Sequence, residues 1–95
     1  MYDRILKRMR DKIRTRQYVM TLHAEEEMDD DDLSIFDVES GILTGAIIER
    51  QRDRSRQEWK YRVQGETLEG DRVIVVVSKF GYADRLVILT VYVEG

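Results

Sequence analysis

The first half of the chain carries its apolar residues at helical spacing. In the opening segment these positions are Ile5, Leu6, Met9 and Ile13. They are separated by charged residues, which predicts an amphipathic helix over residues 3–15. Thr21 is a suitable N-cap for a second helix over residues 22–29. The like-charged run Asp29–Asp32 is unfavourable inside a helix, so we expect the second helix to end there.

A third helix is expected from residue 35 to about residue 43. Ser34 and Asp37 have the spacing of a capping box, with Asp in the place of Glu, and Gly45 follows as a stop signal. Between the first two helices, Tyr18–Thr21 is short and β-prone. This segment is either an edge strand or an extended lead-in to the second helix.

From Ala46 onward the hydrophobic period changes to two, which is typical of strands. The predicted strands cover residues 46–51, 58–64, 72–79 and 85–94. Their connections are short, which favours antiparallel pairing, and two of the three contain glycine. The sequence therefore predicts a single α+β domain over residues 1–95, with N-terminal helices packed on a four-stranded antiparallel sheet.

The alternation also predicts which side chains share a face. Trp59 lies on the apolar side of its strand, and we expect it to be mostly buried between the sheet and the helices. In the last strand, regular alternation places Leu86, Ile88, Thr90 and Tyr92 on one face. The other face is then wholly apolar and must be covered, with Val87, Leu89, Val91 and Val93.

Composition excludes several classes of protein. Among the 95 residues there is no cysteine, which rules out disulfides, thiolate metal sites and cysteine nucleophiles. The apolar runs are too short for a membrane span, and the first residues lack the apolar core of a secretory signal. We therefore expect a cytoplasmic protein. No phosphate-cradling glycine loop and no serine triad spacing is present, so P-loop and triad hydrolysis are disfavoured.

Charge is segregated along the chain, although the net charge is only −3. Residues 23–49 contain ten acids and no Lys or Arg, whereas residues 50–62 contain six bases and two acids. The low overall charge argues against a general nucleic-acid coat protein. A local basic surface remains compatible with it, because charges are screened over about 8 Å at physiological salt.

His23 is the only histidine, with Glu26 and Glu27 three and four residues further on. A nearby carboxylate favours the imidazolium, which suits a general acid near neutral pH. The alternative is a histidine that only caps or fills the junction between helix and sheet. A metal site is disfavoured, because no second histidine or cysteine completes one and the acidic run lacks the EF-hand spacing.

Basic residues alternate in the first predicted hairpin: Arg50, Arg52, Arg54, Arg56, Lys60 and Arg62. An odd-numbered loop would place both halves of this set on one face, forming a cationic stripe for a phosphate backbone. A two-residue loop would place Arg50 and Arg52 opposite Trp59 and Tyr61. Two other interpretations stay open: the charges only protect an exposed edge, or they pair with the acidic run Glu25–Asp32.

Five short motifs occur in order: Thr21-Leu22-His23-Ala24, Asp37-Val38, Gly45-Ala46-Ile47-Ile48-Glu49, Tyr61 to Gly65, and Thr90-Val91-Tyr92. On these motifs the chain resembles the family of domains of unknown function numbered 4258, over residues 17–94. It differs from the family pattern after His-Ala, where Glu27-Met28 and Asp29–Asp32 replace a basic Arg-Met and a later Arg. That family is similar to RelE-like and MqsR-like toxins, small α+β ribonucleases.

The resemblance implies a toxin-type, mRNA-cleaving endoribonuclease that needs no metal or other cofactor, with the ribose 2′-OH attacking its own phosphate. It carries His23 and Tyr92 over as proton-transfer residues, Lys60 and Arg62 as phosphate clamps, and Thr90 as an orienting residue. The implied partners are RNA and an antitoxin of the zinc-finger type. The second function class is a non-catalytic interaction module, either a degraded toxin or a small protein that forms a homodimer.

Overall fold

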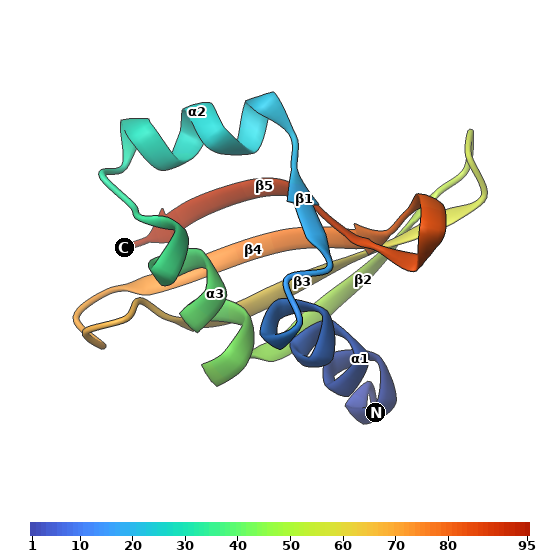
Figure 1. Ribbon diagram of the computed structural model, residues 1–95, viewed down its shortest axis with the longest axis horizontal. Coiled ribbons are helices and arrows are strands. Elements are labelled where there is room, and N and C mark those ends of the chain that lie inside the picture. Colours follow the sequence, from blue (N-terminus) through green and yellow to red (C-terminus); the bar gives the residue numbers. More distant parts are fainter.

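Three α-helices and one five-stranded sheet make up the fold in a computed structural model that describes residues 1–95 (Figure 1). The helices are α1 (Asp3–Arg14), α2 (Leu22–Asp30) and α3 (Ile35–Thr44), and a short 3₁₀ turn, η1, spans Tyr82–Asp84. The strands are β1 (Tyr18–Met20), β2 (Ala46–Asp53), β3 (Glu58–Glu66), β4 (Val73–Phe80) and β5 (Leu86–Glu94). The predicted α+β class and the predicted helices are confirmed. No helix is long and apolar enough to cross a membrane.

The sheet has the order β1-β5-β4-β3-β2, and this corrects the predicted four-stranded antiparallel sheet. Strands β2 to β5 form the expected antiparallel meander, but β1 adds a fifth strand, parallel to β5. Tyr18 pairs with Leu86 and Met20 pairs with Ile88. A three-residue segment has too little pattern to reveal a partner that lies almost seventy residues away in the chain. The edge-strand interpretation of this segment is therefore the one that holds.

Helices α1 and α3 cover one face of the sheet, and the hydrophobic core lies between them and the strands. Its largest fully buried side chains are Met9, Val38, Ile42, Val63, Ile74, Val76, Leu86, Ile88 and Val91. Helix α3 approaches β3 closely at Gly65. A Cβ atom at that position would overlap the backbone oxygen of Gly41. The close approach is therefore possible only without a side chain at residue 65.

Helix α2 lies along the edge of β5 beyond the end of β1 (Figure 1). Thr21 caps the helix by accepting a hydrogen bond from the backbone N–H of Ala24. The carboxylates of Glu27 and Asp31 accept hydrogen bonds from the N–H groups of Val91 and Val93, at 3.1 and 3.3 Å. Part of the acidic run thus covers the free edge of a strand, which would otherwise pair with another chain.

The predicted capping box at the start of α3 is present. Asp37 accepts from the backbone N–H and the hydroxyl of Ser34, and the Ser34 hydroxyl accepts from the Asp37 N–H. The second carboxylate oxygen of Asp37 accepts from the Leu68 N–H at 3.0 Å, which ties the helix to the loop between β3 and β4. These hydrogen bonds, above all the one from the Ser34 backbone, hold the pKa of Asp37 below its ordinary value.

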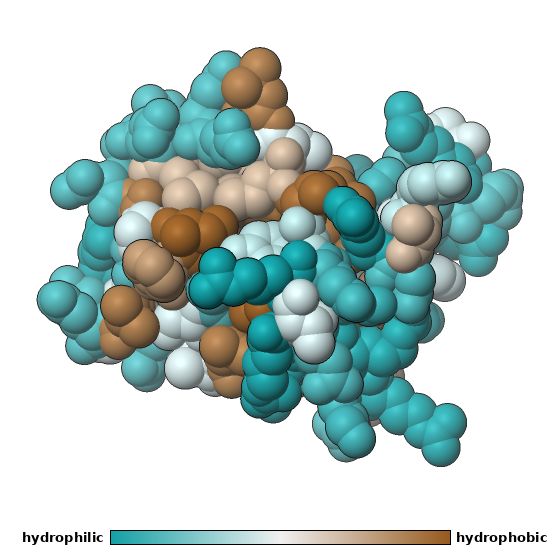
Figure 2. Space-filling model, viewed as in Figure 1, coloured by the Kyte–Doolittle hydropathy of each residue, from teal (hydrophilic) through white to brown (hydrophobic).

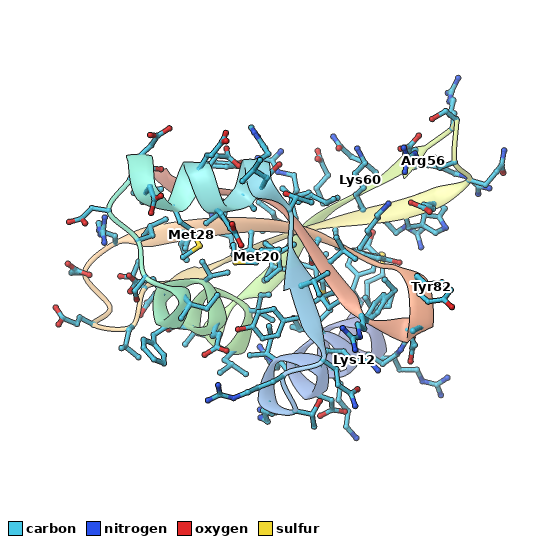
Figure 3. The ribbon with its side chains drawn as sticks, turned by 45° about the horizontal axis from the view of Figure 1, so that its top comes forward. Lys12, Met20, Met28, Arg56, Lys60 and Tyr82 are labelled. Atoms are coloured by element: carbon cyan, nitrogen blue, oxygen red, sulfur yellow. The ribbon has the colours of Figure 1, made fainter.

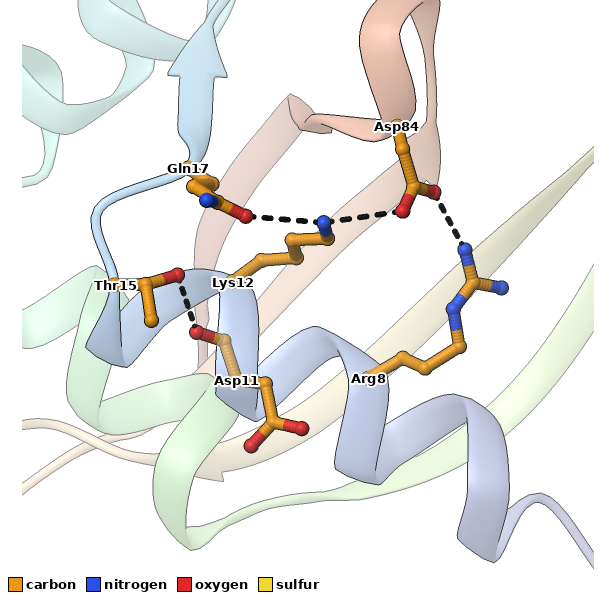
Figure 4. Close-up of polar contacts among 6 residues, drawn as sticks. All are labelled: Arg8, Asp11, Lys12, Thr15, Gln17 and Asp84. Carbon is orange, nitrogen blue, oxygen red and sulfur yellow. Dashed lines mark hydrogen bonds and ion pairs between the residues drawn. The ribbon is translucent and has the colours of Figure 1, made fainter.

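Helix α1 is held to the turn before β5 by ion pairs (Figure 4). Asp84 contacts Arg8 at 2.7 Å and Lys12 at 3.1 Å, and Lys12 also donates to Gln17. The hydrogen bond from Lys12 is the main cause of a lowered pKa at Asp84. Arg8 also lies over the ring of Phe80, 3.9 Å from its centroid. These contacts attach the predicted amphipathic helix to the turn before β5. The other exposed cations of the helix take no part in them.

Irregularities in two strands change the predicted faces. In β5, Ile88 pairs with Ser78 and Thr90 pairs with Val77, so Leu89 is an extra residue. An extra residue reverses the alternation beyond it. Consequently Leu86 and Ile88 share the buried face with Val91, whereas Thr90 and Tyr92 point to the opposite face. The prediction that Leu86, Ile88, Thr90 and Tyr92 share one face is wrong for this reason.

Candidate nucleic-acid interface

The face of the sheet opposite α1 and α3 carries the polar candidates on β3 and β5. Arg62 pairs with Val77 on β4, and Val77 pairs with Thr90 on β5, so all three lie in one row across the sheet. Tyr92 lies two residues beyond Thr90, and Lys60 lies two residues before Arg62, which keeps both on this face. Four of the five predicted catalytic residues therefore share one open surface.

Arg62 is the centre of this group. Its guanidinium donates to the Tyr92 hydroxyl oxygen and to Glu49 Oε1, the latter at 3.3 Å. The hydrogen bond to Tyr92, followed by the one to Glu49, raises the pKa of Arg62 above its ordinary value. Because Arg62 supplies the donor, the Tyr92 hydroxyl keeps its own proton free to donate elsewhere.

Glu49 is a member of the cluster that sequence reasoning missed. The sequence places it in the Gly-Ala-Ile-Ile-Glu strand without assigning it a role. In the structure β2 has an extra residue at Ile48, so Glu49 pairs with Arg62 instead of lying on the core side with Ile47. No pattern in the sequence marks this irregularity, and so the partner of Arg62 is visible only in three dimensions.

Lys60 is the free cation of the open face. It forms no ion pair, whereas Lys79 binds Glu58 at 2.6 Å. Figure 3 shows Lys60 part-way along the hairpin, between the body of the molecule and the tip at Arg56. An anion on this face would therefore meet Lys60 first, because the other cations already have carboxylate partners.

His23 lies apart from the other candidates, in the first turn of α2. Its Nε2 atom is 3.2 Å from Glu27 Oε1, and its side chain is 67% exposed. Glu27 in turn accepts from the N–H of Val91, the residue between Thr90 and Tyr92. The structure links His23 to the end of β5 through Glu27 and shows no direct contact with Lys60, Arg62, Thr90 or Tyr92.

The β2–β3 hairpin projects beyond the rest of the sheet (Figure 1). Its loop has four residues, from Arg54 to Gln57, so the odd-numbered loop that a single stripe requires is not present. Arg50 pairs with Tyr61 and Arg52 with Trp59, and they lie on the opposite face from Lys60 and Arg62. A single cationic stripe is therefore not formed, and the bases cover both sides of the hairpin.

Trp59 packs against the edge of the core and is not exposed, as expected, but part of its cover comes from arginine side chains of its own hairpin and not from the helices. Its ring packs under the guanidinium of Arg50, whose Cζ atom is 3.9 Å from a ring centroid, and Arg52 lies at 5.2 Å. The hairpin extends past the helices, so arginine side chains cover the indole there. Arg54 and Arg56 at the tip have no side-chain partner and are exposed.

The acidic run does not neutralise these arginines. No ion pair joins residues 25–32 to the hairpin, and Glu25, Glu26, Asp29, Asp30 and Asp32 take part in none. The interpretation that Glu25–Asp32 pairs with the hairpin is therefore wrong. The helix and the hairpin remain two oppositely charged surfaces, each available to a partner.

No enclosed pocket is present, and no three acidic or histidine side chains converge to hold a metal ion. The fold and the site thus define a small α+β domain with an open polar sheet face and a protruding basic hairpin. Residues 20–93 match the family described as Domain of unknown function (DUF4258), and the chain belongs to this family. The resemblance drawn from the five motifs is confirmed, since all of them lie in that range. Neither a curated protein nor a solved structure matches the chain.

Proposed function

We propose that the protein is a RelE-like, toxin-type endoribonuclease that cleaves RNA without a metal ion. The observation that carries this proposal is the Arg62–Tyr92 hydrogen bond on an open face that also holds Thr90 and Lys60. A guanidinium and a hydroxyl proton donor at one point are what phosphodiester cleavage requires, because negative charge develops on the phosphate while protons move.

In the proposed reaction the ribose 2′ oxygen attacks the adjacent phosphorus. A bond forms between these two atoms, the bond from phosphorus to the 5′ oxygen breaks, and a 2′,3′-cyclic phosphate results. One proton leaves the 2′-OH and one reaches the 5′ oxygen, with Tyr92 and His23 as the two transfer groups. Arg62 and Lys60 hold the phosphate, and the Thr90 hydroxyl orients it.

The hairpin extends the proposed RNA surface beyond the reacting phosphate. Arg54 and Arg56 at the tip are free, and Arg50 and Arg52 present their guanidinium groups over Trp59. Arginine is well suited to bidentate contact with phosphate oxygens. RNA bound across the open face would therefore meet Arg54 and Arg56 at the tip, and it would reach Arg50 and Arg52 only by passing around the hairpin, because these two lie on the opposite face.

A toxin of this type acts in the cytoplasm, where it would be controlled by an antitoxin. We extend the proposal to such a partner, of the zinc-finger type that the family resemblance implies. This part is tested by co-expression with the product of the neighbouring gene, followed by co-purification. Growth arrest on expression of the chain alone, relieved by that product, is the expected result.

Cleavage is tested with labelled RNA in the presence of EDTA. We expect wild-type protein to yield 2′,3′-cyclic phosphate ends, and RNA carrying 2′-O-methyl groups to stay intact. Tyr92→Phe, Arg62→Gln and His23→Ala should each lower the rate, and the loss should be largest for Arg62→Gln, which removes the phosphate clamp and the Tyr92 contact together. Tyr82→Phe is the matched control, because Tyr82 is exposed and its hydroxyl takes part in no hydrogen bond with Arg62 or the other candidates.

The second candidate function is a non-catalytic interaction module. The separation of His23 from the Arg62–Tyr92 pair favours this alternative, as does the uncompensated acidic helix beside it. If RNA stays intact with wild-type protein, or if the three active-face variants cleave as fast as wild type, the endoribonuclease proposal is wrong. In that case the interaction module, including its homodimeric form, becomes the better hypothesis.

A further inference from the structure

The structure assigns a second surface to protein binding: the apolar groove between α2 and α3, which we propose accepts a basic amphipathic helix of a partner protein. The groove lies on the side of the sheet that α1 and α3 cover, whereas the proposed RNA surface lies on the other side. The inference holds whether or not the chain cleaves RNA.

The floor and walls of the groove come from three elements. Tyr18 and Met20 alternate with the exposed Val19 on β1, so both point into the groove. Figure 3 shows Met20 and Met28 together between α2 and α3, and both side chains are only partly buried. The Tyr18 hydroxyl donates to Glu39 Oε2 on α3 at 2.6 Å. This bond spans the groove at one end.

The apolar surface continues onto α3. Ile35 lies one turn before Glu39, on the same side of the helix. At the first turn of α3, Phe36 is 56% exposed and Leu68 from the neighbouring loop is 64% exposed. Figure 2 shows tan and brown atoms running from beneath α2 to the start of α3, bordered by hydrophilic atoms. An exposed apolar area of this kind, with a polar rim, is typical of a protein interaction site.

Charge at the rim indicates which partner fits. Glu25 and Asp29 flank Met28 on α2 and are exposed without ion pairs. Glu27 and Asp31, by contrast, are used against β5. The helix between residues 22 and 30 contains no Lys or Arg. An apolar stripe bordered on the α2 side by unpaired carboxylates is complementary to a helix whose apolar stripe is bordered on the facing side by Lys and Arg.

The length of α2 sets the size of the occupant. Nine residues of helix extend over about 13 Å. A partner helix lying along it would place apolar residues at positions i, i+3 or i+4, and i+7 in the groove. Its basic residues on the flank would then approach Glu25 and Asp29.

The probe is a synthetic helical peptide of about four turns, with leucines on one stripe and lysines on its flanks. Methionine methyl NMR reports where it binds, because the chain has four methionines in different environments. The Met20 and Met28 methyl signals should shift on titration, while the buried Met9 and the N-terminal Met1 should not. A peptide with glutamate in place of lysine should not bind.

Two double variants distinguish binding in the groove from general electrostatic attraction between the peptide and the acidic helix. Glu25→Gln with Asp29→Asn should weaken peptide binding by about tenfold, since the two exposed ion pairs to the peptide lysines are lost. Glu26→Gln with Asp30→Asn makes the same change in net charge on another side of α2 and should leave binding unchanged. Phe36→Ser should weaken binding while the melting temperature stays constant, because the Phe36 side chain is exposed.

Several results overturn the inference. They are failure of the lysine peptide to bind, equal binding of the glutamate peptide, equal weakening by both charge variants, or shifts confined to methionines other than Met20 and Met28. Sedimentation of the free protein provides one further test. If the protein is a dimer that the peptide dissociates, the groove is occupied by a second copy of the chain and the inference is wrong. Tyr92→Phe should bind the peptide normally, so failure of the groove is distinguishable from failure of the ribonuclease proposal.

Discussion

At the scale of single residues, a few positions cannot accept a larger side chain without strain, because backbone atoms lie too close. Gly65 on β3 is the clearest case, since its missing side chain lets the Gly41 carbonyl of α3 approach the strand. Unlike a flexible side chain, a backbone carbonyl within a helix cannot move aside cheaply.

We therefore expect Gly65→Ala to lower the free energy of unfolding by about 3 kcal/mol, the upper end of the usual range for overpacking. Urea denaturation measures this change. Gly95→Ala is the matched control, because a Cβ atom there meets no other atom within 4 Å. Equal stability of the two variants would contradict the close packing of α3 on β3.

Asp37 gives a pH-dependent prediction at the same scale. Its pKa is lowered in the folded protein from the ordinary value of 3.8, so its contribution to stability is present above that value and is lost as the pH falls through the folded pKa. Asp37→Ala should cost about 1–2 kcal/mol at neutral pH, the range for loss of a helix cap. The cost should shrink in acid.

Denaturation at neutral and acidic pH tests this prediction. Asp29→Ala serves as the control, because Asp29 is exposed and has no hydrogen-bond partner on its side chain. A stability difference between wild type and Asp37→Ala that stays constant on acidification would show that the carboxylate charge is not what stabilises the cap.

At the scale of elements, α2 is held to β5 through carboxylates that occupy the free edge of the strand. Glu27→Ala removes the acceptor for the Val91 N–H, and leaving such a group without a partner costs about 1–3 kcal/mol. Hydrogen exchange should be faster at Val91 and unchanged at Ile74 in the core. Glu26→Ala is the control, and similar exchange in both variants would contradict the edge contact.

The Tyr18–Glu39 hydrogen bond joins β1 to α3. It gives a second pH-dependent prediction, which concerns stability at alkaline pH. Burial, the largest cause, together with the bond to Glu39 raises the pKa of Tyr18 to about 12. A raised pKa means that the stabilisation is complete below the ordinary value of 10 and is lost as the pH rises toward 12. Wild type should therefore lose more stability than Tyr18→Phe over this interval, and parallel losses would show that the bond is absent in solution.

At the scale of the whole molecule, the separation of acidic and basic surfaces is the dominant property. Arg54→Gln with Arg56→Gln should weaken RNA binding and reduce its salt slope by about 0.7 for each phosphate that is no longer neutralised. The melting temperature should not change, because neither side chain has a partner. Arg50→Gln with Arg52→Gln should instead lower it, since both stack on Trp59.

Arg4→Gln with Lys7→Gln is the control for this experiment, because it makes the same change in charge on the exposed side of α1. If this control weakens RNA binding as much as the tip variant does, the hairpin has no special role. The result would then be a general effect of net charge.

Local signals in the sequence determined the elements of this protein. Helical periodicity, the Thr21 and Ser34 caps and the change to period two place three helices and four strands close to their observed positions. The motifs correctly assign the chain to its family, because each motif is a run of contiguous residues that is visible without the tertiary structure. Within each strand the shared faces also follow from the sequence, since positions two apart share a side: Lys60 lies with Arg62, and Thr90 lies with Tyr92.

Tertiary structure alone decided how these elements meet. The extra residues at Ile48 and Leu89 reverse the alternation in β2 and β5, which moves Tyr92 out of the core side and brings Glu49 to Arg62. The pairing of β1 with β5 and the position of His23 on the outside of α2 also depend on contacts between distant segments. A periodic pattern records burial averaged along a segment, whereas register, strand order and charge pairing are set by partners that are far away in the chain.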